Sequence, residues 1–333
     1  MPANLTPEYK DAELAYRRAR DPKDRLEALR EMLRTIPKHK GTEHLRADIK
    51  TKIKELREDL EAPAKVGTRG GPVTVIRPEG AAQLALLGPP NSGKSTLHDR
   101  LTGSHAPVGP YPFTTQYPQP GMMPFEDIAL QLLDLPPLAK SHPVPWIGNT
   151  LYATDGALLV VDLGNPDCVA QVLEIHGLLG ERKVILTGDW DAATKNGDLF
   201  TKLVPALLVA NKSDTLADPV GELSVLEELT EVDYPTLAVS AETGEGTEEL
   251  AAWLFEHLRI VRVYTKMPGH APDLGRPYTL RAGDTVVDLA TLVHRDIASG
   301  FRYARVWGPA TFDGQQVGRD HVLADGDVVE LHA

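Results

Sequence analysis

The stretch Gly88-Pro89-Pro90-Asn91-Ser92-Gly93-Lys94-Ser95-Thr96 decides the fold of this chain. It follows the pattern G-x-x-x-x-G-K-[ST], which is the phosphate-binding P-loop. A short apolar run typical of a strand, residues 83–87, precedes it, and residues 96–101, which are typical of a helix, follow it. A P-loop needs this strand–loop–helix context, so the sequence favours a phosphate site over a chance glycine-rich turn.

The residue types in this loop suit a nucleotide. Gly88 and Gly93 let the backbone curl so that successive N–H groups face phosphate oxygens, and the helix N-terminus adds partial positive charge. Lys94 supplies a full charge for the β- and γ-phosphates, and the Ser95 hydroxyl is placed to bind Mg²⁺. The predicted nucleotide contacts in this loop are Pro89, Pro90, Asn91, Ser92, Gly93, Lys94, Ser95 and Thr96.

Length and composition indicate a globular protein of more than one domain. The chain has 333 residues, too many for one typical core, and 42% of them are hydrophobic. No apolar run is long enough to span a bilayer, and residues 1–6 contain no apolar signal segment. The single cysteine, Cys168, cannot form an internal disulfide and is expected to be a small buried hydrophobe. These features predict a cytoplasmic location and no membrane partner.

The net charge of −12 is unevenly distributed. Residues 1–70 hold 17 Lys and Arg against 13 Asp and Glu, whereas residues 71–258 hold 9 against 25. The remaining residues are balanced, with 9 of each sign. The charge pattern argues against non-specific nucleic-acid binding by the whole chain, although a basic N-terminal segment could contact RNA.

Residues 1–62 are predicted to be helical. Thr6-Pro7-Glu8 and Asp21-Pro22 are helix-start signals. One apolar stripe ends at Pro37, and a second follows Thr42, so the two helices are expected to form an antiparallel hairpin. The stripes are Leu26, Leu29, Leu33 and Ile36, and then Leu45, Ile49, Ile53, Leu56 and Leu60. The basic residues between 38 and 57 form either a solvated face or an RNA-facing surface.

Residues 83–258 alternate apolar runs with helical patterns, which predicts an α/β domain with a mostly parallel sheet. The expected strands are 128–133, 157–161, 206–210 and 237–239, and the expected helices are 166–179 and 247–258. Residues 63–82 form a linker in which 73–76 could be a short strand. The polar, Gly/Asp-rich residues 188–198 are interpreted as a surface excursion.

Further candidate site residues follow the predicted strands, where open α/β sheets bind ligands. Asp134 is placed to hold Mg²⁺ through water, as a Walker-B aspartate does. Asn211-Lys212-Ser213-Asp214 ends the next core strand, and the Asp214 carboxylate can accept both N–H groups of a guanine edge. Adenine offers no such donor pair. Ser240-Ala241-Glu242 follows another strand, where backbone N–H groups could meet guanine O6.

In this order the motifs resemble the five G motifs of TRAFAC-class GTPases, with Thr114-Thr115 as the second and Asp134-Leu135-Pro136 as the third. The segment Ala106–Thr115, followed by Pro120-Gly121, resembles the Obg/DRG subfamily. Residues 260–333 look like a TGS domain, a small ubiquitin-like β-grasp fold. The segments that carry this resemblance are Arg262–Lys266, Leu280–Val286, Ala304–Gly308 and Gly318–Val329.

The expected fold class is therefore α/β: a P-loop GTPase (G) domain with a mostly parallel sheet, an N-terminal helical hairpin and a C-terminal β-grasp TGS domain. The hairpin resembles the helical start of DRG-type proteins less specifically. The expected division is 1–62 for the hairpin, 63–82 for the linker, 83–258 for the G domain and 259–333 for the TGS domain. Without the resemblance, residues 260–333 predict only a small α+β module whose histidines lack metal-ligand spacing.

The resemblance implies roles for individual residues and ligands. Thr115, with Thr114 as the adjacent candidate, should close over the γ-phosphate and Mg²⁺, and Lys94 and Thr115 would act in catalysis. Asn91 occupies the position at which related GTPases coordinate K⁺, although an asparagine there can also simply form the turn. The implied ligands are GTP and GDP, Mg²⁺ and K⁺.

Two residues depart from the family pattern. The third motif is usually D-x-P-G, whose glycine N–H bonds the γ-phosphate, but this chain has Pro137, which has no N–H. The next residue, where Ras-type proteins place a water-orienting glutamine, is Leu138. Both features predict slow intrinsic hydrolysis. His142 could position water, but a lone loop histidine is more often simply exposed.

The leading hypothesis is a cytoplasmic GTPase that works as a GTP/GDP switch. By resemblance its partner would be the ribosome or another translation-related RNA–protein assembly, with an accessory protein possible. The alternative is a guanine-nucleotide-dependent binding module with negligible hydrolysis. A third interpretation, an ATPase or small-molecule kinase, is disfavoured by residues Asn211–Asp214.

Overall fold

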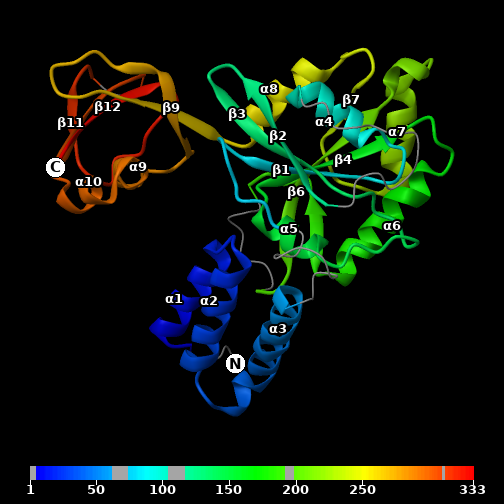
Figure 1. The fold of residues 1–333 in the computed structure, drawn as a ribbon, viewed down its shortest axis with the longest axis horizontal. Helices are drawn as coiled ribbons and strands as arrows, with labels where there is room; N and C mark the ends of the chain where they lie inside the picture. The colour runs from blue at the N-terminus through cyan, green and yellow to red at the C-terminus, as the bar shows by residue number, and fades with distance from the viewer. Residues whose placement is uncertain (1–4, 62–73, 104–116, 192–198, 310–311) are drawn as a thin grey trace, which may run out of the picture.

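The computed structural model describes residues 5–61, 74–103, 117–191, 199–309 and 312–333. Its N-terminal part is helical (Figure 1), with α1 (Pro7–Arg18), α2 (Pro22–Thr35) and α3 (Glu43–Glu61). The Thr6 hydroxyl accepts a hydrogen bond from the Tyr9 N–H, the Asp21 carboxylate accepts one from the Lys23 N–H, and a proline opens each helix. Both predicted helix starts are confirmed, because each cap satisfies an N–H that the first turn leaves unpaired.

The predicted apolar stripes pack α2 against α3. Leu26, Leu29, Ile36, Ile49 and Leu56 are buried, Leu33, Leu45 and Ile53 are partly buried, and Leu60 is exposed. Helix α1 also contributes to this core through Tyr9, Ala12 and Tyr16, so a third helix packs beside the predicted hairpin. Phe200, from the segment before a strand of the central sheet, is buried in the same cluster and joins the helices to that sheet.

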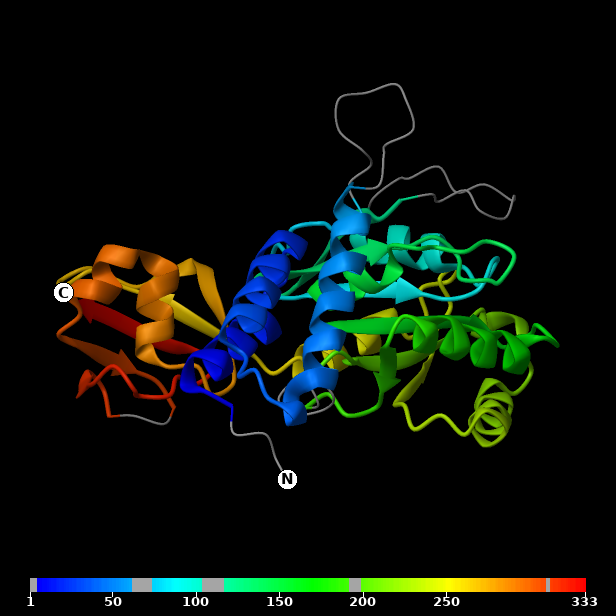
Figure 2. The ribbon, with the colours of Figure 1, turned by 90° about the horizontal axis from the view of Figure 1, so that it is seen from below.

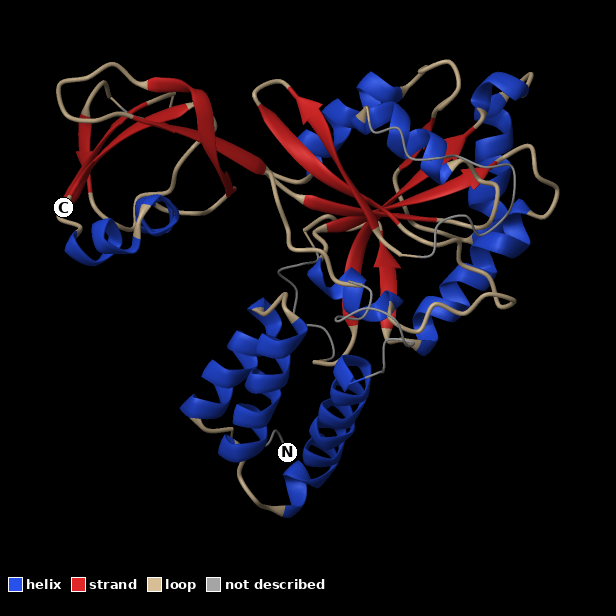
Figure 3. Ribbon diagram, in the orientation of Figure 1, coloured by secondary structure: helices blue, strands red, loops and turns tan. Residues whose placement is uncertain are grey.

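The central sheet has the strand order β2-β3-β1-β4-β6-β5, with β7 also paired to β6. Only the β2–β3 pair is antiparallel, which confirms the mostly parallel sheet (Figure 3). The strands are β1 (Gln83–Leu87), β2 (Gln119–Phe125), β3 (Ile128–Asp134), β4 (Gly156–Asp162), β5 (Val184–Thr187), β6 (Lys202–Asn211) and β7 (Thr236–Ala238).

Helices cover both faces of this sheet because its strands carry apolar side chains on both sides. In β1, Ala85 and Leu87 face one core and Leu84 and Leu86 face the other. The first core lies under α5 (Ile147–Ala153), α6 (Cys168–Glu181) and α7 (Pro219–Thr230). The second lies under α4 (Lys94–Thr102) and α8 (Thr247–His257).

Several elements of this region were not predicted. Strand β2 contains Pro120, Gly121 and Pro124, which weaken the sequence signal but are tolerated in an edge strand. Strand β5 has only four residues, and α5 and α7 were also missed. The suggested strand at 73–76 is wrong for its described residues, because residues 74–76 form no strand.

The C-terminal part forms a second sheet, in the order β11-β10-β12-β8-β9. Its strands are β8 (Ile260–Thr265), β9 (Asp273–Arg281), β10 (Tyr303–Trp307), β11 (Gln315–Val317) and β12 (Asp327–His332). Helix α9 (Val286–Val293) matches the predicted pattern at 286–294, and α10 (Arg295–Gly300) follows it. One helical layer on a mixed sheet agrees with the expected β-grasp fold.

Charged side chains connect the three parts, which lie side by side in Figures 1 and 2. Asp155, just before β4, forms ion pairs with Arg20 of the α1–α2 connection (2.6 Å) and with Arg281 at the end of β9 (3.3 Å). Arg262 of β8 contacts Glu126 and Asp127 at the β2–β3 turn. Among the described residues, no helix combines the length and apolar character needed to cross a membrane.

Candidate nucleotide-binding site

The P-loop connects the carboxyl end of β1 to the N-terminus of α4. Gly88 and Gly93 have φ angles of 153° and 84°. A Cβ on Gly88 would lie 2.2 Å from the Val160 carbonyl oxygen, and one on Gly93 would lie 2.2 Å from Asn211 Nδ2. Side chains at these positions would collide with these neighbours, so the close packing of the loop and the positive φ angles explain both glycines.

Lys94 lies inside the loop, with 5% of its surface exposed. Its Nζ donates hydrogen bonds to the carbonyl oxygens of Gly88 (3.2 Å) and Pro89 (2.9 Å). Burial lowers the pKa of Lys94 to about 8, although the negative charge of Asp134 opposes this shift. Among the described residues only neutral carbonyls hold this buried ammonium, which is therefore suited to exchange them for charged phosphate oxygens.

The two described candidate Mg²⁺ ligands meet at the carboxyl end of β3. Ser95 Oγ donates a hydrogen bond of 2.6 Å to Asp134 Oδ2, and the Asp134 side chain is buried. A hydroxyl and a carboxylate are the hard oxygen donors that Mg²⁺ prefers, so the donor set fits this ion. Thr114 and Thr115 lie outside the described residues.

Asn211 links the phosphate loop to the predicted base-reading loops. Its Nδ2 donates to the Ser92 carbonyl oxygen (2.9 Å), and its Oδ1 accepts from the Ala241 N–H (3.0 Å). The neighbouring Lys212 has a φ of 64°, and its Nζ lies 2.7 Å from Asp162 Oδ2. The exposed Asp214 side chain makes no hydrogen bond or ion pair with another described residue. Its carboxylate is therefore available to a ligand.

The predicted Ser240–Glu242 loop is held from the P-loop helix. Ser240 Oγ accepts from the Thr243 N–H (3.0 Å). Arg100 of α4 donates from Nε to the Ala241 carbonyl oxygen (3.0 Å) and also contacts the Glu242 carbonyl. Sequence reasoning missed Arg100 and Asp162. The available signals were a basic residue on the helix after the P-loop and an acidic residue ending a strand.

The remaining predicted loop residues differ in exposure. Pro89 is buried, Pro90 and Thr96 are half-buried, and Asn91 is exposed with a φ of 63°. This backbone conformation agrees with the turn-forming role of Asn91. The buried hydroxyls of Ser92 and Ser213 have no hydrogen-bond partner among the described residues. Both residues lie close to Asn211: Ser92 accepts a hydrogen bond from it through its carbonyl oxygen, and Ser213 follows it by two positions in the chain.

Comparison with known proteins agrees with these motifs. The family described as "50S ribosome-binding GTPase" matches residues 83–188, and the TGS domain family matches residues 261–333. The chain is 30% identical to developmentally-regulated G-protein 2 of Arabidopsis thaliana, over 90% of this chain and 88% of that protein. The chain belongs to the developmentally regulated GTP-binding protein family. It is also 29% identical to a GTP-binding protein of Methanocaldococcus jannaschii, over 92% of both chains.

The central sheet and the C-terminal sheet of this family member thus correspond to a P-loop GTPase fold and a TGS domain. Among solved structures, a GTP-binding protein of Pyrococcus horikoshii superposes with a TM-score of 0.48 and 19% identity, over 75% of this chain and 99% of that one. The chain is a GTP-binding protein of the GTPase type.

The third motif of this family member is fixed by its own contacts. Pro137 and Leu138 are both buried, and the Leu138 N–H donates to the Gly88 carbonyl oxygen at 3.0 Å. The Lys140 N–H donates to Glu174 Oε1 of α6 at 2.5 Å. The Leu138 side chain packs into the sheet core with Val144 of the following loop. The structure therefore places an apolar core residue, and not a side chain directed at a ligand, directly after Pro137.

Proposed function

We propose that this protein binds GTP and GDP with Mg²⁺ and acts as a switch that hydrolyses GTP slowly. The observation that carries the proposal is the Asn211 bridge. One buried amide joins the Ser92 carbonyl of the phosphate loop to the Ala241 N–H of the base-reading loop, and Asp214 is exposed beside it. This arrangement supports one continuous site for a phosphate chain and a base.

Each site residue has a proposed task. Residues 89–96 surround the phosphates with backbone N–H groups, and Lys94 neutralises developing charge while water attacks the γ-phosphate. Ser95, Asp134 and Thr115 would hold Mg²⁺, which supplies positive charge to the phosphate oxygens when bound. Asp214 selects guanine, in the loop formed with Asn211 and Lys212. The Ser240, Ala241 and Glu242 segment would face guanine O6 through its backbone.

Slow turnover is proposed from Pro137 and Leu138. Pro137 cannot donate a hydrogen bond to the γ-phosphate, and Leu138 has no polar group and is buried. K⁺ is proposed at Asn91, whose exposed side chain makes no hydrogen bond with another described residue. A monovalent cation there would add positive charge beside Lys94.

A ribosomal or other translation-related partner is proposed in the cytoplasm. Two observations support it: the description of the family matching residues 83–188, and the excess of Lys and Arg in residues 1–70. We propose that residues 1–62 and 259–333 carry the partner contacts and that residues 83–258 carry the nucleotide, with 63–82 as the linker. A pull-down with GTP analogue against GDP would test this assignment.

The alternative is a guanine-nucleotide-dependent binding module with negligible hydrolysis. It is favoured by the burial of Leu138 and by the hydrogen bond from its N–H to the Gly88 carbonyl. A third motif that is already bonded to the P-loop can change its conformation little when a γ-phosphate binds.

Single-turnover phosphate release with GTP and Mg²⁺, measured in K⁺ and in Na⁺, separates the two functions. The switch requires slow release that Lys94→Ala abolishes and that K⁺ accelerates through Asn91. GTP binding with release no faster than in Lys94→Ala would support the binding module. Equal competition by ATP would remove the guanine assignment altogether.

A further inference from the structure

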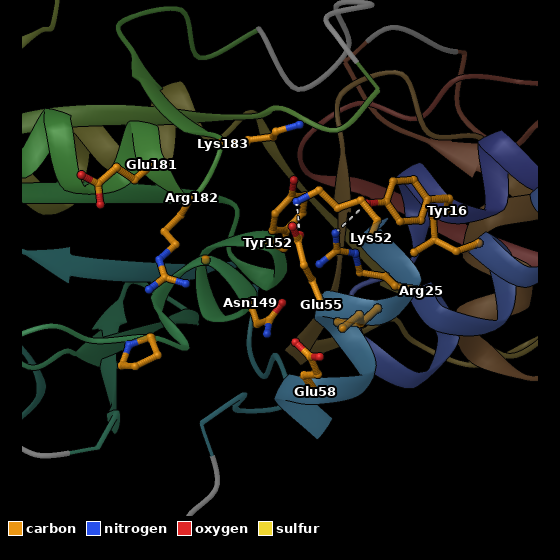
Figure 4. A pocket seen from close by; sticks show the side chains of 14 residues that line it. Tyr16, Arg25, Lys52, Glu55, Glu58, Asn149, Tyr152, Glu181, Arg182 and Lys183 are labelled. Atoms are coloured by element: carbon orange, nitrogen blue, oxygen red, sulfur yellow. Dashed lines mark hydrogen bonds and ion pairs between the residues drawn. The ribbon is translucent and has the colours of Figure 1, made fainter. Parts of the chain in front are cut away.

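A polar pocket of about 280 Å³ lies between the N-terminal helices and the central sheet (Figure 4). Its walls come from α1, α2 and α3 on one side and from α5 and the α6–β5 turn on the other. Tyr152 and Lys183 lie just before β4 and β5, so the pocket is at the amino-terminal edge of the sheet. The P-loop follows the carboxyl end of β1, roughly 17 Å away along a strand of five residues. The pocket is thus separate from the nucleotide site.

Arg25 of α2 is the central residue of this pocket. Only 4% of its surface is exposed, and the one hydrogen bond of its guanidinium to another described residue runs from Nη2 to the Tyr16 hydroxyl (2.9 Å). The guanidinium lies 3.6 Å from the centroid of the Tyr152 ring and 5.1 Å from that of Tyr16. Within the described residues it forms no ion pair. A guanidinium has five N–H donors, and a buried cation without an anion is costly, so the pocket holds unused donor capacity.

The other charges around the pocket leave an excess of positive charge. Glu55 lies 2.7 Å from Lys52 and Glu58 lies 3.8 Å from the exposed Lys54, so each of these carboxylates has a lysine partner. Among the described residues, Arg182 and Lys183 of the α6–β5 turn have no ion-pair partner, and neither has Glu181. Together with Arg25, the described lining of the pocket therefore holds three cations without an ion-pair partner and one such carboxylate.

Arg25 also acts on a nearby lysine outside the pocket. Burial lowers the pKa of Lys202, at the start of β6; Asp155 opposes the shift, and the positive charges of Arg20 and Arg25 add to it. The positive charge of Arg25 is thus one of the smaller contributions to the lowered pKa of Lys202.

We propose that this pocket is a second ligand site, which takes one small oxyanion of the phosphate class between Arg25, Arg182 and Lys183. The planar guanidinium of Arg25 presents paired donors that match two oxygens of such a group. The small volume and the carboxylates on the rim disfavour a polyphosphate. Small-molecule sites occur preferentially at domain interfaces, and this pocket lies between the N-terminal helices and the central sheet.

The bound anion would connect α2 to the α6–β5 turn. Binding would therefore favour the arrangement in which the helices lie against the sheet, and the protein would become more resistant to unfolding as the anion concentration rises. The source of the group is either free inorganic phosphate or the phosphate ester of a small metabolite.

The test is calorimetric titration of the full chain with inorganic phosphate and, separately, with glycerol 3-phosphate. GDP is present at saturation so that phosphate binding at the P-loop does not contribute to the measured heat. Ionic strength is held constant with chloride. We expect saturable binding of at least one of the two, weakened about 10-fold or more by the double variant Arg182→Ser/Lys183→Ser. Both residues are exposed, so this variant should fold. Arg30→Ser, an exposed position on α2 outside the pocket, is the matched control and should bind as the wild type does.

Arg25→Lys keeps the charge but loses the paired donors, and we expect it also to bind the anion more weakly than the wild type does. Tighter binding of the ester identifies a metabolite, and equal binding identifies the phosphate group alone. The absence of saturable binding to the wild type, or equal binding to the wild type and the double variant, overturns the proposal.

Discussion

Replacing Asn211 with alanine would test whether one amide holds the nucleotide site together. The side chain is 1% exposed, and its two hydrogen bonds of 2.9 and 3.0 Å end on the Ser92 carbonyl and the Ala241 N–H. Asn211→Ala leaves both backbone groups without their partner. An unsatisfied buried group costs about 1–3 kcal/mol, so two of them give about 2–6 kcal/mol before relaxation. Because water can enter the space left by the amide, we expect a loss of about 2–4 kcal/mol in the free energy of unfolding.

The same change should weaken GDP binding, because the phosphate loop and the Ser240–Glu242 loop would have to be aligned at the time of binding. Urea unfolding of the nucleotide-free protein and calorimetric titration with GDP measure the two effects. Asn165→Ala is the matched control, since this asparagine makes only local hydrogen bonds in the loop between β4 and α6. If Asn211→Ala changes the unfolding free energy by less than about 0.5 kcal/mol, as a surface substitution does, the bridge does not organise the site.

Four further changes test individual roles in the site. Asp214→Asn should lose about 2–4 kcal/mol of GTP affinity and shift the preference towards XTP, because an amide donor then meets the donor edge of guanine; unchanged GTP affinity in a competition assay contradicts the assignment. Ser95→Ala should reduce the Mg²⁺ dependence of nucleotide binding, measured by titrating Mg²⁺ at fixed GDP; an unaltered dependence removes Ser95 from the metal site. Pro137→Gly should widen the calorimetric affinity gap between a non-hydrolysable GTP analogue and GDP by about 1–2 kcal/mol, one charged hydrogen bond less the entropy of a glycine loop; an equal or smaller gap shows that Pro137 is compensated. Burial lowers the folded-state pKa of Lys94 from 10.5 to about 8, so between these pH values the unfolded chain binds more protons than the folded one. The free energy of unfolding of the nucleotide-free protein should therefore rise with pH across this window, more steeply than in Lys94→Met. Equal pH slopes in the two proteins contradict this prediction.

The sequence predicts the parts of the site that depend on contiguous residues. The P-loop, the residue that ends β3 and the Asn211–Asp214 segment can each be recognised locally, because the chemistry requires these residue types at a fixed spacing and next to a strand. The helix starts at Thr6 and Asp21 are predictable for the same reason, since a cap and a proline act within one turn.

The sequence does not predict contacts that depend on the packing of distant segments. Arg100 meets the Ala241 carbonyl 141 positions away, and Asn211 meets Ser92 across 119 positions. Strand β2 was missed because its prolines oppose strand propensity, and its pairing with β3 decides the outcome instead. The pocket around Arg25 could not be predicted, because its walls come from several separate helices and a turn of the chain.

The contacts of Gly88 bear on how the proposed switch would work. Its carbonyl oxygen accepts from both Lys94 Nζ and the Leu138 N–H. If a nucleotide draws Lys94 towards its phosphates, the Gly88 carbonyl still keeps its bond to Leu138 and is not left buried without a partner. The bond would therefore lower the cost of releasing Lys94, and it ties the third motif to the P-loop. On this basis the difference between the GTP and GDP states would depend on Lys94, Thr115 and Mg²⁺, and the loop after Pro137 would serve as a fixed wall of the site.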